Sequence, residues 1–294
     1  MHRISLDSYN KQIFRNICIS NLQLIRLIPL KPIPCNNGDI ANEAVLIEFR
    51  ELPHIEFIIR NAIHKLGDLF SYTIVCGNLN YDMIVYICGM ICGSISHNIN
   101  IIKLNVGNLT NEEYNKLLYT KDFWNLLKGN KILIYQEDSI IFKKNIQDFL
   151  KYDYIGAPWK RNEHTLDNLS FGNGGFSLRS RELMLDVLSI KDEVFSYYEK
   201  TNAKITENYP PEDLFFSLGA LLLKNNNLPD PQTASEFSSE NIVNLDSFAG
   251  HRFWNCHPDW MNRMILLIND IGNELNLNND DNNKDIDNIK QNNE

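Results

Sequence analysis

Polar residues that could act in catalysis or ligand binding are most concentrated in KILIYQEDSIIF, residues 131–142. Gln136, Glu137 and Asp138 interrupt its apolar run where a strand over residues 131–138 is predicted to end. Ligands of α/β proteins bind outside the carboxyl ends of the strands. Because side chains alternate along a strand, we expect Asp138 and Gln136 on one side and Glu137 on the other, so the two carboxylates should not act as a pair. A carboxylate placed like Asp138 suits Mg²⁺ or Mn²⁺ bound together with substrate phosphates. A turn or helix cap formed by Asp138 is the alternative.

Two further stretches could contribute to the same site. Asn173-Gly174-Gly175 removes side chains over a short span, so the backbone could approach a ligand closely, although a tight hairpin turn has the same composition. Glu212 and Asp213 follow two prolines at the start of a predicted helix. The helix dipole alone favours acidic residues there. A carboxylate held at a rigid helix start could also act as a general base.

Two histidines lie in DSFAGHRFWNCHPDW, close to the end of the predicted domain. His251 and His257 are surrounded there by phenylalanine and tryptophan, which is typical of buried core histidines. A neutral imidazole is also a common ligand of divalent metals. Either histidine could therefore supply a nitrogen ligand to a site that begins with a carboxylate.

Alternating strand and helix patterns must position these residues. Apolar runs predict buried strands over residues 44–49, 72–77, 98–106 and 131–138. Helical spacing of apolar residues predicts helices over residues 54–67, 81–93, 111–129, 181–190 and 209–224. This alternation indicates an α/β fold with a mostly parallel sheet. We expect one domain over residues 41–272, preceded by an extension over residues 1–40 and followed by a disordered polar tail over residues 273–294.

Composition narrows the classes of function. A net charge of −9 and a pI near 5.3 exclude an overall basic surface for nucleic acid. The six cysteines form no CxxC pair, so we expect buried free thiols in a reducing compartment. The N-terminus shows no signal-peptide pattern, and no apolar run reaches the roughly 18 residues of a membrane span. These features predict a cytoplasmic protein.

Several motifs occur together in an order that resembles one family. They are AVLIEFRELPHIEFIIRNAIHKLG, YTIVCGNLNY, IYQEDSIIF, DFLKYDYIGAPW, GNGGFSLRSRELM, PPEDLFFS and FAGHRFW. They span roughly residues 40–260 and resemble a glycosyltransferase-like domain family of uncharacterised function, found in plants, other eukaryotes and giant DNA viruses. That family is similar to the GT-A glycosyltransferases, which have a single Rossmann-like domain and use nucleotide-sugar donors.

The resemblance implies a role for each candidate residue. Asp138 would bind Mn²⁺ or Mg²⁺ as the last carboxylate of a motif that is often Asp-x-Asp, with Gln136 in place of the first aspartate. His251 would be the later metal ligand, and His257 is the second choice. The nucleotide sugar would be held by the other candidates, which are Glu48, Phe49, Arg50, Gln136, Glu137, Asn173, Gly174 and Gly175.

The implied reaction is the transfer of a sugar from a UDP- or GDP-linked donor to a hydroxyl of a glycan, protein or small molecule. Glu212 or Asp213 would be the base, and the metal ion would neutralise the departing diphosphate. Inversion is favoured because Glu212-Asp213 resembles the acidic pair of inverting GT-A enzymes. One alternative is an inactive GT-A-like binding module, which Gln136 suggests. The other is a sugar-phosphate nucleotidyltransferase, although FRELPH, residues 49–54, lacks the glycine-rich basic loop that this class needs.

Overall fold

A six-stranded sheet forms the centre of the protein. The computed structural model describes residues 5–30, 41–93, 99–160, 171–201 and 209–291, with side chains as far as residue 276. In spatial order the strands are β3 (Ile99–Lys103), β2 (Ser71–Cys76), β1 (Asn42–Ile47), β4 (Lys131–Tyr135), β7 (Phe176–Ser180) and β6 (Tyr154–Gly156). Strands β1 to β4 are parallel, and β7 runs antiparallel to both of its neighbours. The predicted α/β fold with a mostly parallel sheet is confirmed.

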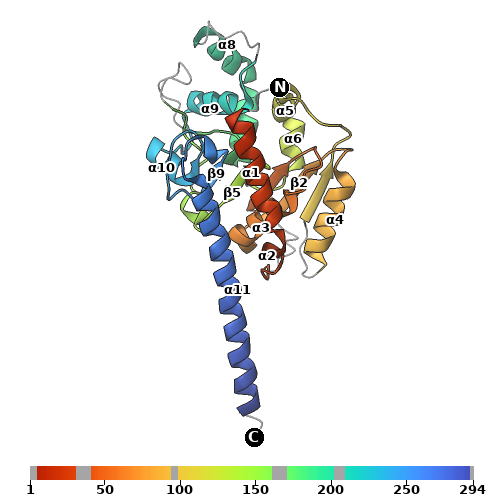
Figure 1. Cartoon of the computed structure of the whole chain (residues 1–294). Coiled ribbons are helices and arrows are strands. Elements are labelled where there is room, and N and C mark those ends of the chain that lie inside the picture. Colours follow the sequence, from red (N-terminus) through yellow and green to blue (C-terminus); the bar gives the residue numbers. More distant parts are fainter. Residues whose placement is uncertain (1–4, 31–40, 94–98, 161–170, 202–208, 292–294) are drawn as a thin grey trace.

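Helices cover both faces of this sheet (Figure 1). One apolar cluster contains residues of α1 (Leu6–Ser20), α2 (Leu22–Arg26), α3 (Ile55–Leu66), α4 (Tyr81–Cys92) and α11 (Trp260–Gln291). The other contains residues of α5 (Asn111–Leu118), α6 (Lys121–Leu126), α7 (Arg181–Ser189), α8 (Lys191–Thr201) and α9 (Glu212–Leu223). Ala44 and Leu46 of β1 belong to the first cluster, whereas Val45 and Ile47 belong to the second. This division follows from the two-residue period of a strand buried on both faces.

A small second sheet begins where β4 ends. Its strands, in spatial order, are β5 (Ser139–Ile141), β9 (Ala249–His251) and β8 (Ser238–Ser239), and α10 (Pro231–Phe237) leads into it. Only Gln136, Glu137 and Asp138 connect β4 to β5. Because Ser139 pairs with His251, this sheet fixes the acidic connection beside that histidine. Within the described residues there are also three short 3₁₀ turns, namely η1 (Gly67–Leu69), η2 (Ile146–Asp148) and η3 (Phe253–Asn255).

The predicted helix over residues 111–129 is two helices. The first ends at Leu118, and Thr120 starts the second by accepting a hydrogen bond from the backbone N–H of Phe123 at 3.3 Å. Threonine is a favoured N-cap, so its side chain stabilises a new helix start inside what reads as one periodic pattern. Among the described helices, none is long and apolar enough to cross a membrane.

Helix α11 extends into the segment for which a disordered tail is predicted, residues 273–294. Helix α11 continues through the polar residues as far as Gln291. Its first turns place Trp260, Met264, Leu267 and Ile271 in the core. Propagation of a helix costs little once its nucleus is fixed.

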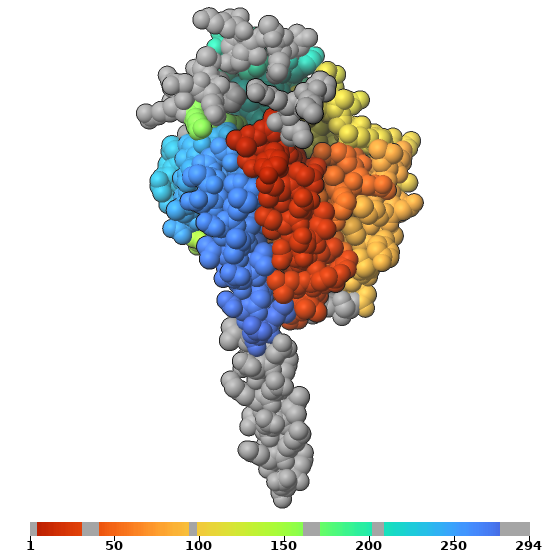
Figure 2. Space-filling model, in the orientation of Figure 1, coloured from red at the N-terminus to blue at the C-terminus, as the bar shows by residue number. Residues whose placement is uncertain are grey.

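Helices α1 and α2, which lie within the predicted extension over residues 1–40, pack into the core. Phe14 and Cys18 of α1 and Ile25 of α2 are fully buried in the first cluster. Figures 1 and 2 show α1, in red, lying along α11, in blue, on one face of the molecule. Cys18, Cys76 and Cys88 are buried free thiols, as expected, but Cys92 and Cys256 are only partly buried. Cys35 lies outside the described residues.

Candidate functional site

Two adjoining cavities open at the carboxyl ends of β1 and β4. The first cavity, of about 390 Å³, is lined by Lys11, Glu48, Phe49, Arg50, Glu137 and Asp138. The second cavity, of about 710 Å³, is lined by Asn173, Gly174, Gly175, Glu212, Asp213 and Glu240. Gln136, His251 and Arg252 line both cavities. The fold therefore brings together all the predicted site residues except His257, which is not among the described residues that line either cavity.

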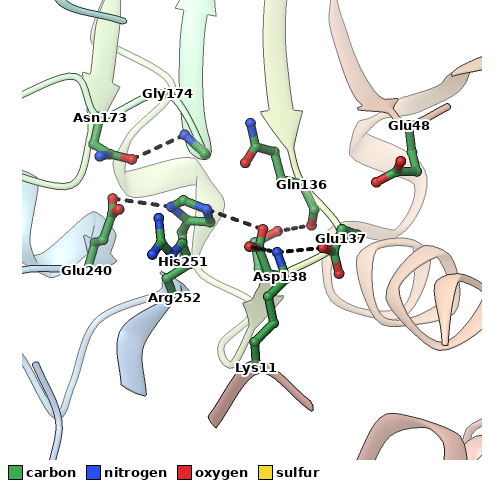
Figure 3. A network of polar contacts seen from close by, with 12 residues as sticks. Lys11, Glu48, Gln136, Glu137, Asp138, Asn173, Gly174, Glu240, His251 and Arg252 are labelled. Carbon is green, nitrogen blue, oxygen red and sulfur yellow. Dashed lines mark hydrogen bonds and ion pairs between the residues drawn. The ribbon is translucent and has the colours of Figure 1, made fainter. Parts of the chain in front are cut away.

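Glu137 and Asp138 form a turn instead of the end of a strand. Strand β4 stops at Tyr135, and the N–H of Ser139 donates to the carbonyl of Gln136 at 3.1 Å. The prediction that strand alternation separates the two carboxylates is wrong, because neither residue has strand geometry. Both carboxylates contact one ammonium group: Lys11 Nζ lies 2.7 Å from Glu137 Oε1 and 2.7 Å from Asp138 Oδ2 (Figure 3).

Hydrogen bonds and cationic partners keep both buried carboxylates ionised. Glu137 contacts Arg15 Nη2 at 2.7 Å and His54 Nε2 at 2.8 Å. Burial alone would raise the pKa of Glu137, but the hydrogen bonds from His54 and Arg15 lower it to about 2. Burial would likewise raise the pKa of Asp138, and the charges of His251 and Lys11 instead hold it well below its usual range. The turn therefore carries two negative charges that the protein itself neutralises.

His251 lies between two carboxylates. Its Nε2 is 3.3 Å from Asp138 Oδ1, and its Nδ1 is 3.2 Å from Glu240 Oε2 (Figure 3). Although burial would lower it, the charges of Glu240 and Asp138 raise the pKa of His251 to about 10. The raised pKa favours the imidazolium form, which has no lone pair for a metal ion.

These contacts do not fit the predicted divalent-metal site. Asp138 is paired with Lys11 and His251, and protonated His251 faces carboxylates on both sides. Across the part of the chain that the structure describes, no group of three or more His, Cys, Asp or Glu side chains could hold a metal ion. His257, the alternative metal ligand, is not among the described residues that line the two cavities. Burial and the charge of Arg263 lower its pKa.

The residues after β1 form a turn closed by a carboxylate. Glu48 Oε1 accepts hydrogen bonds from the N–H groups of Phe49 and Arg50, each at 2.9 Å. The Arg50 guanidinium binds the same carboxylate through Nε at 2.8 Å and Nη2 at 2.7 Å. With 42% of its side chain exposed, Arg50 lies at the wall of the first cavity. Glu48 therefore fixes the Arg50 guanidinium at the predicted nucleotide-binding position.

The glycines of the Asn173-Gly174-Gly175 stretch accommodate other side chains of the site. A Cβ on Gly175 would overlap three ring atoms of His251, and one on Gly174 would overlap Glu212 Oε1. Asn173 Oδ1 accepts a hydrogen bond from the N–H of Gly175 at 3.1 Å. The two glycines also line the second cavity. Glycine is therefore needed here for the internal packing, and it would also allow the predicted close approach of a ligand.

Replacing Gly175 by alanine is expected to destabilise the protein by about 1–3 kcal/mol, because the added methyl must displace the buried His251 ring. The loss can be measured by urea denaturation. Gly89→Ala in α4 is the matched control, since no heavy atom lies within 4 Å of its added Cβ. That change should stabilise the helix by up to about 1 kcal/mol. A Gly175→Ala protein as stable as the parent would contradict the packing described here.

Glu212 and Asp213 have different surroundings at the start of α9. Glu212 is buried in a two-pronged ion pair with Arg179, at 2.6 and 2.9 Å. Asp213 is half-buried at the wall of the second cavity and accepts from the N–H groups of Gly174 at 3.1 Å and Leu214 at 2.8 Å. Burial and the nearby charge of Glu212 raise the pKa of Asp213 to about 7. Asp213 is therefore the carboxylate of the predicted pair that can exchange a proton near neutral pH.

Helix α1 contributes site residues that the sequence reading missed. Asp7, Lys11 and Arg15 are spaced at i, i+4 and i+8, so they share one helix face. Asp7 binds Arg252 at 2.8 Å and the indole N–H of Trp254 at 2.9 Å. The regular spacing of these charged residues is the signal that the sequence offers. It does not reveal which residues their side chains contact. Glu240, which faces His251, lies in a stretch with no comparable signal.

Three solved structures illustrate the similarity of the chain to known folds at low identity. The glycosyltransferase GlyE of Streptococcus pneumoniae TIGR4 is 12% identical with a TM-score of 0.41, over 80% of this chain. The chain spans 64% of the length of GlyE. The mannosyltransferase PcManGT of Pyrobaculum calidifontis, in complex with GDP-Man and Mn²⁺, is 10% identical with a TM-score of 0.38, over 74% of this chain and 81% of its own. Glucosyl-3-phosphoglycerate synthase of Mycobacterium tuberculosis, in complex with Mn²⁺, UDP and phosphoglyceric acid, is 12% identical with a TM-score of 0.34, over 58% and 72% of the two chains.

The chain has no match among curated proteins. At the level of families, residues 98–252 match the one described as a protein of unknown function, DUF5672. This matched region runs from β3 to Arg252. It includes the acidic turn formed by Glu137 and Asp138, the glycine pair Gly174-Gly175, Asp213 and His251. The protein belongs to the DUF5672 family.

Proposed function

We propose that the protein transfers a sugar from a UDP- or GDP-linked donor to an acceptor hydroxyl. The observation that carries this proposal is the junction of the two cavities. The first has cationic side chains in its wall, and the second has a half-buried carboxylate whose pKa is about 7. A diphosphate requires the first environment, and activation of an alcohol requires the second.

The donor would occupy the first cavity with its sugar directed toward the second. Arg50 and Arg252 line the first cavity and keep 42% and 39% of their side chains exposed, so their guanidinium groups can meet an anion. Gln136 lines both cavities and marks the place where the sugar–phosphate bond would lie. Its amide can donate to a phosphate or sugar oxygen and also accept a hydrogen bond.

Asp213 would act as the base on the acceptor. Its carboxylate takes the proton of the acceptor hydroxyl, the oxygen attacks the anomeric carbon, and the sugar–phosphate bond breaks with its electron pair left on the diphosphate. A single displacement of this kind inverts the anomeric carbon, so inversion stays our prediction. The N–H of Gly174 holds Asp213 Oδ2 at 3.1 Å and fixes the carboxylate at the cavity wall. The predicted Mn²⁺ or Mg²⁺ has no role in this proposal, because its expected ligands are already paired.

Nucleotide binding tests the proposal. UDP, GDP and their sugars should raise the Tm, since a ligand at about 100 times its Kd adds about 2.7 kcal/mol to the free energy of unfolding. ADP serves as the comparison nucleotide. Arg50→Met should reduce the shift, whereas Arg181→Met, in a separate cavity, should not. If neither UDP nor GDP in any form shifts the Tm, the proposal is wrong. Binding without release of sugar from any donor would indicate an inactive binding module.

A further inference from the structure

The acidic turn already holds a cation that belongs to the protein. Lys11 Nζ lies 2.7 Å from a carboxylate oxygen of Glu137 and 2.7 Å from one of Asp138 (Figure 3). Its side chain is 24% exposed and forms part of the wall of the first cavity. A lysine ammonium has three N–H donors. Two are directed at the carboxylates, which leaves one for a ligand in the cavity.

Helix α1 holds this ammonium in place from both sides. One turn before Lys11, Asp7 is fixed by Arg252 at 2.8 Å, and one turn after it, Arg15 is fixed by Glu137 at 2.7 Å. On the same helix Phe14 is fully buried, with its ring 5.3 Å from that of Trp254. A cation carried by an anchored helix loses little freedom when a ligand binds, which favours a binding role.

The charges around the turn are balanced without a metal ion. The buried carboxylates of Glu48, Glu137, Asp138 and Glu240 face four basic side chains, which are Lys11, Arg15, Arg50 and His251. A divalent ion between these carboxylates would have to displace Lys11 and would add to a site that is already neutral.

We propose that Lys11 holds the diphosphate of the donor in the position where GT-A enzymes place a divalent ion, so that this protein binds its nucleotide without a metal. The proposal rests on the proposed function, since it concerns the same donor. The ammonium is fixed by Glu137 and Asp138 on one side and donates its remaining N–H to a phosphate oxygen on the other. The acidic turn then positions a cation supplied by helix α1.

Calorimetric titration of UDP and GDP in EDTA and in MnCl₂ tests this proposal. The parent protein should bind with the same affinity in both, within about twofold. In EDTA, Lys11→Met should weaken binding at least tenfold, which corresponds to about 1.4 kcal/mol. Lys11→Arg, which keeps the charge, should recover part of that loss. Lys131→Met is the matched control, because Lys131 is 20% exposed and pairs with Asp153 at 2.9 Å away from both cavities.

A second measurement uses Mn²⁺ alone on the ligand-free protein. Electron paramagnetic resonance should show no stoichiometric binding to the parent and one bound Mn²⁺ in Lys11→Met, in which the two carboxylates have lost their shared cation. Tighter nucleotide binding by Lys11→Met in EDTA, or binding by the parent only with Mn²⁺, would overturn the role of Lys11. If the parent binds neither nucleotide in either buffer, the proposed function itself fails. Circular dichroism of each variant checks that the fold is retained.

Discussion

Replacing Arg179 by methionine is expected to lower the free energy of unfolding by about 3–5 kcal/mol, because it leaves a buried carboxylate without its partner. Arg179 is fully buried and binds both oxygens of Glu212, at 2.6 and 2.9 Å. Its guanidinium carbon also lies 4.9 Å from the ring centre of Tyr154 and 5.6 Å from that of Phe216. Urea denaturation followed by circular dichroism measures the loss.

A double replacement separates lost packing from an unpaired charge. Arg179→Met combined with Glu212→Leu removes both charges, and we expect it to recover much of the stability lost in the single variant. The exposed pair of Lys116 and Glu112 provides the control, since removing one partner there should cause no measurable change. A single Arg179→Met variant that unfolds at the parent's urea midpoint would show that Glu212 does not depend on this pair.

Replacing Asp213 by asparagine is expected to lower the transfer rate by a factor of about 10²–10⁴, the usual contribution of a general base. Asparagine has the same shape and can still accept from the N–H of Gly174. Affinity for UDP or GDP should remain within about twofold, because Asp213 lines only the second cavity. The rate is measured as nucleotide released from the donor that gives the largest Tm shift. An unchanged rate in Asp213→Asn would assign the base to another residue.

Because the pKa of Asp213 is raised, we expect both the transfer rate and the free energy of unfolding to depend on pH. The base must be ionised, so the transfer rate of the parent should rise as the pH passes about 7. Between the ordinary aspartate pKa of about 3.9 and the folded value, the folded state keeps a proton that the unfolded state releases. The contribution of Asp213 to the free energy of unfolding is therefore largest below this window and declines as the pH rises through it. Asp213→Asn should lack that decline when the two proteins are denatured at a series of pH values.

The order of strands and helices could be read from the sequence because burial patterns are local. The apolar run 44–49 and the helical spacing of residues 54–67 each report which side of an element is buried, and the structure has β1 and α3 there. The break at Thr120 was missed because a cap and a helical position are both compatible with threonine. The candidate site residues are likewise marked by a local signal, since they are polar residues at the ends of elements.

The state and partners of those residues depended on tertiary structure. Lys11 is 127 residues from Asp138 in the chain, and no local pattern connects them. His251 reads as a possible metal ligand within FAGHRFW, yet the charges of Glu240 and Asp138 raise its pKa to about 10. By itself, the sequence determined the α/β fold and the presence of carboxylates at the ends of its elements. Only the tertiary structure decided which carboxylate is neutralised and which is poised near pH 7, because a charge responds to whatever the fold brings within a few ångströms, regardless of distance along the chain.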